Sequence, residues 1–231
     1  MGARVLAVAA AHARILARRR TALLLLALLP LAFYGALYRH SPHAITTAGV
    51  LSAFSAGGAG IFSMLPARAA DQRLALAGYQ PAALILGRLL VLELAALGIS
   101  AVTSAVMIAG TRPAHPGEVL AGVILTGAVA VPLGLALGAL LPRELEAVLV
   151  LIGIVGIQVT TQPDTVISKL LPFHAAAQLL DAATSTPVTL WPRLAASVGY
   201  AAALLAITWA AWRRRATARH ATSPPSPACE A

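Results

Sequence analysis

The sequence predicts an all-α, polytopic membrane protein with six transmembrane helices. Hydrophobic residues make up 59% of the 231 residues and charged residues only 11%, and the mean hydropathy is +0.82. A soluble domain with a polar surface rarely has this balance. In lipid, only helices and closed barrels satisfy the backbone. Barrel strands alternate apolar and polar residues, whereas runs such as residues 23–26 and 148–151 do not, so helices are expected.

The predicted transmembrane domain covers residues 21–212. Each span is an apolar stretch near the roughly 20 residues that a helix needs to cross a hydrocarbon core of about 30 Å. All but the third are free of charged residues, and the six expected spans are residues 21–38, 44–67, 82–109, 119–141, 147–163 and 194–212.

Arginine is concentrated on one side of this topology. It precedes the first span, follows the last, and occurs in the second and fourth connections, at Arg4, Arg14, Arg18, Arg19, Arg20, Arg68, Arg73, Arg143, Arg213, Arg214, Arg215 and Arg219. By the positive-inside rule both termini are cytoplasmic, which requires an even number of spans. The net charge of +9 therefore reflects topology and contact with anionic membrane lipids in preference to nucleic acid.

Both ends of the chain are expected to lie outside the bilayer. Residues 1–20 form a basic cytoplasmic segment, and no small-residue cleavage site closely follows Tyr38, so the first span is expected to be permanent and not a signal peptide. Residues 213–231 are expected to be a disordered cytoplasmic tail because residues 222–227 are rich in proline and serine. The only cysteine, Cys229, lies in that tail, which excludes an internal disulfide.

Two connections carry more information than the spans. Residues 68–80 contain good helix formers, a Gly78 stop and Pro81 placed to open the next helix, so a short helix at the cytoplasmic membrane surface is expected. A solvated turn whose arginines anchor lipid headgroups is the alternative. In the outer connection, residues 172–181 are expected to form a short amphipathic helix before the last span, either an ordinary interfacial helix or a gating element.

The third span contains two ionisable residues, Arg88 and Glu93. Arg88 lies about 10 Å from Pro81 by helical rise, so its long side chain is expected to extend back to the cytoplasmic interface. Glu93 is near mid-membrane and must face the bundle interior or a wet cavity. It is either a protonated carboxyl bonded to a neighbouring helix or part of a substrate path. The two side chains point about 140° apart around the helix and are not expected to pair.

The sequence of residues 71–90 resembles the permease subunits of type-two ATP-binding cassette (ABC) exporters. In that family a basic segment precedes the first span, and a charged cytoplasmic helix follows the second. A Gly-Leu-like element, a proline and a Gly-Lys-Leu-Leu element then lead into the third span. Here Gly78-Tyr79, Pro81 and residues 87–90, with arginine in place of lysine, occupy those places. The outer segment around residues 171–173 is also similar.

The resemblance implies a permease subunit of the cell (plasma) membrane that works by alternating access and does no covalent chemistry. It implies docking on two separate ATPase subunits and pairing with a second copy or a sister permease, and it leaves the substrate open. The coupling helix would carry Arg68, Asp71, Gln72, Arg73 and Leu74.

No catalytic or cofactor motif accompanies these features. The sequence has no G-x-x-x-x-G-K-[ST] loop, and its only lysine is Lys169, so ATP hydrolysis is expected on another subunit. The glycines of the second and fourth spans are expected to allow close helix packing. Zinc-hydrolase and nucleophilic-serine motifs are absent as well, so no metal, no cofactor and no enzymatic activity are expected. The alternatives are a non-transporting membrane scaffold and, less favoured, an intramembrane enzyme.

Overall fold

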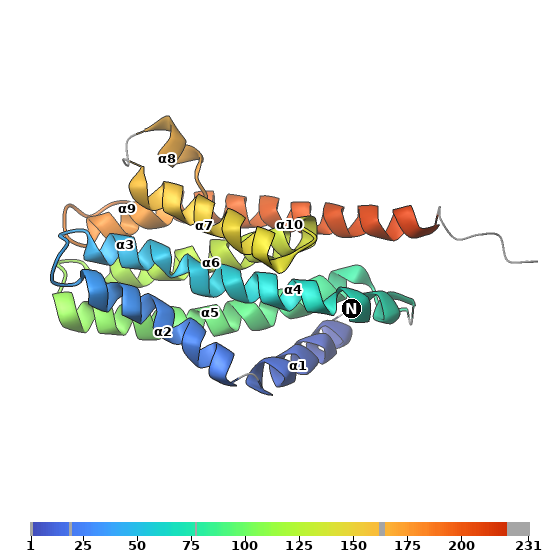
Figure 1. The fold of residues 1–231 in the computed structure, drawn as a ribbon. Helices are drawn as coiled ribbons and strands as arrows, with labels where there is room; N and C mark the ends of the chain where they lie inside the picture. Colours follow the sequence, from blue (N-terminus) through green and yellow to red (C-terminus); the bar gives the residue numbers. More distant parts are fainter. Residues whose placement is uncertain (1, 19, 77, 162–164, 221–231) are drawn as a thin grey trace, which may run out of the picture.

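Every regular element is a helix in the part of the chain that the computed structural model describes, residues 2–18, 20–76, 78–161 and 165–220. Most helices lie side by side in one bundle (Figure 1). They are α1 Gly2–Arg18, α2 Arg20–Leu37, α3 Ala44–Leu51, α4 Ala53–Leu76, α5 Pro81–Thr111, α6 Pro116–Leu140, α7 Glu144–Thr160, α8 Val166–Leu170, α9 His174–Ala182 and α10 Leu190–His220. The predicted all-α fold is therefore confirmed.

Four stretches of the described helices are long and apolar enough to cross a membrane: Ala44–Leu65, Pro81–Thr111, Pro116–Leu140 and Leu190–Arg214. They coincide with the second, third, fourth and sixth predicted spans. The first and fifth predicted spans are also helical, as α2 and α7, but they are shorter. The apolar part of α2 is Leu24–Leu37, and α7 has 17 residues. The described helices thus provide four candidate membrane spans.

The second predicted span is divided at Ser52, where α3 ends and α4 begins. The Ser52 hydroxyl donates to the carbonyl of Gly49 at 2.5 Å, and the Ser52 amide reaches the carbonyls of both Ala48 and Gly49. A serine side chain that bonds back to the preceding turn competes with the regular helical ladder and bends the helix. Ser52 therefore explains why one apolar stretch forms two helices.

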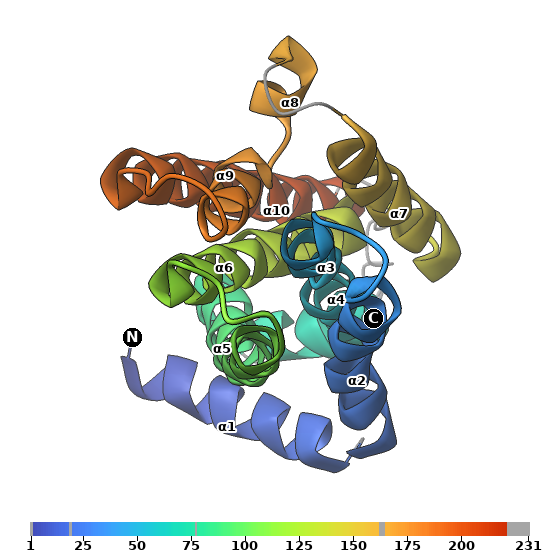
Figure 2. The ribbon, with the colours of Figure 1, turned by 90° about the vertical axis from the view of Figure 1, so that its left-hand side faces the viewer.

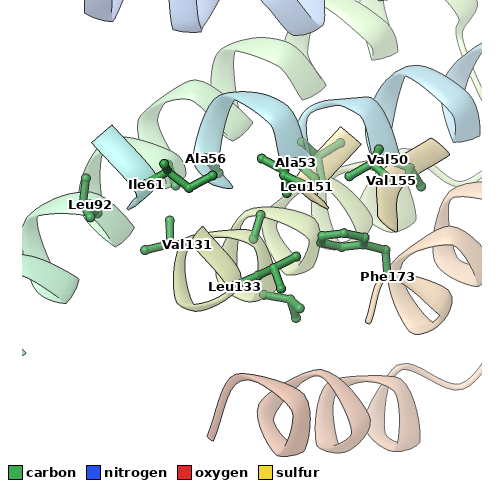
Figure 3. Close-up of a cluster of buried hydrophobic side chains, with 14 of the residues drawn as sticks. Val50, Ala53, Ala56, Ile61, Leu92, Val131, Leu133, Leu151, Val155 and Phe173 are labelled. Atoms are coloured by element: carbon green, nitrogen blue, oxygen red, sulfur yellow. The ribbon is translucent and has the colours of Figure 1, made fainter. Parts of the chain in front are cut away.

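Helix α6 is the axis of the bundle. It packs against α3, α4, α5, α7, α9 and α10, and in the end-on view it lies between α5 on one side and α9 and α10 on the other (Figure 2). Around it the main core gathers Ile61 from α4, Val131 from α6, Leu151 from α7 and Phe173 beside α9 (Figure 3). All four side chains are buried, so the core links parts of the chain that are distant in sequence.

Small residues allow α4 and α6 to approach closely, as the sequence predicts. A Cβ added to Gly134 would collide with the backbone carbonyl of Gly57, and one added to Gly60 would lie 2.9 Å from the carbonyl of Val131. A Cβ on Gly138 would lie 2.8 Å from the Cβ of Met64. The predicted packing role of these glycines is therefore confirmed, since backbone-to-backbone contact leaves no room for a side chain.

The outer faces of several helices expose large apolar side chains. The exposed fraction is 60% for Leu94 on α5, 57% for Leu149 on α7 and 58% for Val198 on α10. A water-soluble monomer rarely exposes apolar side chains around so much of its surface. Apolar helices with these exposed faces are typical of a membrane protein.

The bundle has two ends, which we name by their helices (Figure 1). The α1 end holds α1, the α4–α5 turn and the α6–α7 turn. The α9 end holds α8, α9 and the α2–α3 and α5–α6 turns. At the α9 end, the predicted helix at residues 172–181 is confirmed as α9, His174–Ala182.

Two expectations about the α1 end and the tail need correction. Residues 68–76 form the last turns of α4 and not a separate surface helix, because α4 runs through Pro66 to Leu76 without interruption and ends only before Gly78, which has a φ of 85°. The expected disordered tail is helical through His220 as the continuation of α10. Residues 221–231 lie outside the described residues.

Candidate functional site

The candidate site is a buried polar cluster at the α1 end, centred on Arg88 of α5. Its Nη2 donates to both carboxylate oxygens of Asp71, at 2.9 and 3.0 Å. Arg88 is 1% exposed and Asp71 is 4% exposed. Charge-assisted bonds of this kind are about twice as strong as neutral ones. The pair joins the end of α4 to the beginning of α5, on either side of the turn at Gly78.

Two more residues complete the Arg88 cluster, which we define as Arg88, Asp71, His12 and Met64. Arg88 Nε donates to His12 Nε2 at 2.9 Å, and Arg88 Nη1 approaches the Met64 sulfur at 2.8 Å. An arginine has no acceptor, so His12 must be neutral and carry its proton on Nδ1. Burial lowers the pKa of His12 below its ordinary value of 6.5, and the positive charge of Arg88 lowers it further, while Asp71 opposes the effect.

The cluster corrects the predicted behaviour of Arg88. The side chain does not extend to the membrane surface, because Asp71 lies within reach inside the protein and pairs with it. Asp71 is likewise not an exposed coupling residue, since the pair buries its side chain. As predicted, Arg88 and Glu93 form no ion pair in the described part of the chain.

Helix α1 reaches Arg88 because Gly87 leaves room for it. A Cβ at Gly87 would lie 2.8 Å from Val8 Cγ1 and 3.0 Å from the carbonyl of Val5. Val8 and Ala9 are buried and His12 follows one turn later, so one stripe of α1 faces α5. Arg4, at 3.4 Å, donates to the carbonyl of Gly78. The expected basic N-terminal segment is therefore an ordered amphipathic helix docked on the bundle, below α5 in Figure 2.

Arg68 has an internal role as well. Its Nη2 donates to the carbonyls of Gly138 and Leu141. These carbonyls lie in the last turn of α6 and just beyond it, where helix carbonyls have no intrahelical partner and where a positive charge is favourable. Arg68 therefore fixes the end of α6 to α4 and is half-buried.

Of the three remaining predicted coupling residues, two are exposed and the side chain of the third is not described. Arg73 and Leu74 are exposed on the last turns of α4, Leu74 with 37% of its surface accessible. The side chain of Gln72 lies outside the described ones. Of the five residues, Arg68 thus fixes α4 to the end of α6, Asp71 fixes α4 to α5, and Arg73 and Leu74 are exposed beside them.

Comparison of the sequence with family models and with curated proteins found no match. No family is therefore assigned, and the chemistry of the site rests on its own geometry.

Glu93 lies five residues after Arg88 on α5, about one and a half helical turns farther from the Gly78 turn. It is half-buried on α5, between buried Leu92 and exposed Leu94. Its carboxyl has no hydrogen bond to another described residue, so the bond to a neighbouring helix that was one of its two expected roles is not seen there.

The contacts of the cluster link α1, α4 and α5 to one another. Among the described residues no group of three histidine, cysteine, aspartate or glutamate side chains is placed to hold a metal ion. Sequence reasoning missed His12 and Met64, although Val5, Val8, Ala9 and His12 follow the i, i+3, i+4, i+7 spacing of one helix face. That spacing was the available indication that His12 would face inward.

Proposed function

We propose that this chain is the transmembrane permease subunit of an ATP-driven exporter, powered by separate ATPase subunits that dock at the α1 end. The observation that carries the proposal is the Arg88 cluster. It ties α1, α4 and α5 together beside a turn that presents Arg73 and Leu74 outward. A force applied to that turn moves three helices as one body, which is how a rigid element transmits motion to a bundle.

The proposal includes six membrane crossings with both termini in the cytoplasm. Helices α2 and α7 supply the two additional crossings. With 18 and 17 residues they extend about 27 and 26 Å by helical rise, close to the hydrocarbon thickness of about 30 Å. The arginine bias then places the α1 end inside and the α9 end outside. The exposed apolar faces contact lipid and a second copy or a sister permease.

Orientation is testable with cysteines introduced in a Cys229→Ala background. Thr184→Cys should react with a membrane-impermeant maleimide added outside intact cells, whereas Gln80→Cys, at an exposed position of the α4–α5 turn, should react only after the membrane is opened. External labelling at Gln80 would contradict the proposed topology.

ATPase docking is tested by Arg73→Glu combined with Leu74→Asp. Mispaired charge at an interface costs several kcal/mol, so an ATPase subunit that co-purifies with the wild type should be lost or its activity uncoupled from transport. Arg68 is unsuitable for this test because it holds the end of α6. The matched control is Arg143→Glu, at the neighbouring α6–α7 turn, where 82% of the arginine side chain is exposed.

Equal membrane abundance of wild type and variants is the condition for comparing their ATPase binding. Undiminished binding and transport in the double variant would leave Arg73 and Leu74 as lipid-facing residues and would favour the non-transporting scaffold.

A further inference from the structure

A polar cavity of about 360 Å³ opens at the α9 end, on the opposite side of the bundle from the Arg88 cluster. The α2–α3 turn, α3, the end of α7, α8 and α9 all contribute to its wall. Its polar lining residues include His43, Thr46, Gln158, Thr160, Thr161 and Asp181. The volume lies at the lower end of the range typical of small-molecule sites, about 300–1,000 Å³.

The lining is rich in hydrogen-bond acceptors. The Thr160 hydroxyl donates to the carbonyl of Gly156 at 2.9 Å, and the Thr161 hydroxyl donates to that of Ile157 at 2.6 Å. Each hydroxyl has a single proton, which is used in this bond, so toward a ligand it can act only as a hydrogen-bond acceptor. The end of α7 therefore presents oxygen lone pairs toward a ligand.

Gln158 adds an acceptor with no protein partner. Its side-chain carbonyl is buried and has no hydrogen bond to another described residue, and the residue is only 5% exposed. A buried, unsatisfied polar atom costs about 1–3 kcal/mol. Because Gln158 lines the cavity, a ligand that donates a hydrogen bond would remove that cost.

Asp181 supplies the negative charge. Its Oδ1 accepts a hydrogen bond from the Thr46 hydroxyl at 2.6 Å and lies 3.9 Å from His43 Nδ1. The carboxylate is still 36% exposed. Asp181 is the sole acidic side chain among the described residues of the lining, which include no lysine or arginine. Carboxylate and carbonyl acceptors together suit a ligand that carries both positive charge and several N–H donors.

We propose that the cavity at the α9 end binds the primary ammonium group of a small polar molecule through Asp181 and Gln158. The same chemistry is offered by a free, hydroxylated amine and by the ethanolamine headgroup of a lipid. The inference does not depend on an ATPase partner, because binding is a property of this chain alone. Its failure is therefore distinguishable from failure of the proposed transport function.

The test uses the full chain in phosphatidylcholine nanodiscs and isothermal titration. The probe is 2-deoxystreptamine, a cyclohexane ring with two amines and three hydroxyls, and the control ligand is scyllo-inositol, the same ring with hydroxyls only. Saturable binding of the amine is expected, at least about tenfold tighter than binding of the inositol, because the inositol cannot form the charge-assisted hydrogen bonds. Nanodiscs that also contain phosphatidylethanolamine distinguish a free amine from a lipid headgroup as the ligand. Weaker apparent binding of the probe in these nanodiscs identifies the ethanolamine headgroup as a competitor for the cavity.

Two variants test whether the probe binds in the cavity. Asp181→Asn should weaken binding by about ten- to a hundredfold, and Gln158→Met, which replaces an unpartnered buried amide with an apolar chain and keeps the fold, should weaken it roughly three- to tenfold. Glu144→Gln, on an exposed carboxylate at the other end of α7, should have no effect. Absence of saturable amine binding, equal binding of the inositol, or unchanged binding in Gln158→Met would overturn the proposal.

Discussion

Removing one partner of the buried ion pair tests whether the Arg88 cluster holds the α1 end together. In Asp71→Leu, the guanidinium of Arg88 remains 1% exposed in the folded structure but loses both bonds to the carboxylate. An uncompensated buried charge typically costs 3–5 kcal/mol. We therefore expect the free energy of unfolding to fall by about 3–5 kcal/mol, a large part of the stability of an ordinary domain.

Replacing both partners should cost less than replacing either. In Asp71→Leu/Arg88→Met no charge is left unpaired, and exchanging a buried pair for apolar residues of similar size is often neutral or stabilising. The remaining cost is the hydrogen bond that His12 accepts from Arg88, about 1 kcal/mol. The coupling energy of the double-mutant cycle should then exceed about 3 kcal/mol.

The assay is an SDS titration of the purified protein in mixed micelles, followed by loss of helical circular dichroism. Arg73→Met is the matched control. The substitution removes a cation from α4, the helix that carries Asp71. Because the Arg73 side chain is exposed, the free energy of unfolding should change by no more than about 0.5 kcal/mol. Single-variant effects that add within about 0.5 kcal/mol would refute the claim that the two charges act as one buried pair.

Acidification should weaken the docking of α1, because its folded position requires a neutral His12. The pKa of His12 is lowered by burial and by Arg88, so its contribution to stability is complete above the ordinary pKa of 6.5 and is lost as pH falls from there through the lowered value. Between about pH 8 and pH 5, the free energy of unfolding of the wild type should therefore decrease as pH falls. This dependence on pH should be weaker in His12→Gln, and an unchanged dependence would contradict a neutral, buried His12. At the α4–α6 contact, Gly134→Ala should destabilise the protein by about 1–3 kcal/mol, since its new Cβ meets the Gly57 carbonyl. Gly153→Ala, which meets nothing within 4 Å, should be neutral in the same titration, and equal effects would contradict close packing at Gly134.

Local sequence rules predicted the elements of this fold well. Gly78 ends α4 and Pro81 opens α5 because their backbone preferences are fixed by the residue itself. The apolar stretches likewise became helices. The division at Ser52 was not foreseen, because a serine hydroxyl has several possible acceptors and only the folded chain shows that it bonds to Gly49.

The buried charges show where sequence reasoning fails. Arg88 and Asp71 are 17 positions apart, so neither helical spacing nor periodicity connects them, and each alone was expected to reach the membrane surface. The connection arises only after the turn at Gly78 folds α5 back against α4. His12 is more distant still, 76 positions from Arg88. Pairing of this kind is a tertiary property, and so is the hydrogen bond in the cavity wall between Thr46 and Asp181, which are 135 positions apart.

Hydropathy also could not separate the central helix from a peripheral one. The apolar windows of α6 and α10 have mean hydropathies of 2.2 and 1.7, yet 78% of the first window is buried and only 17% of the second. In a bilayer both lipid and protein core are apolar, so hydropathy alone does not indicate which face packs.

The same substitution on the two helices tests this difference in burial. Val123→Phe, on α6 at 0% exposure, should cost about 1–3 kcal/mol through overpacking. Val198→Phe, on α10 at 58% exposure, should be neutral, and equal losses of stability would show that α10 is packed against a partner at that position.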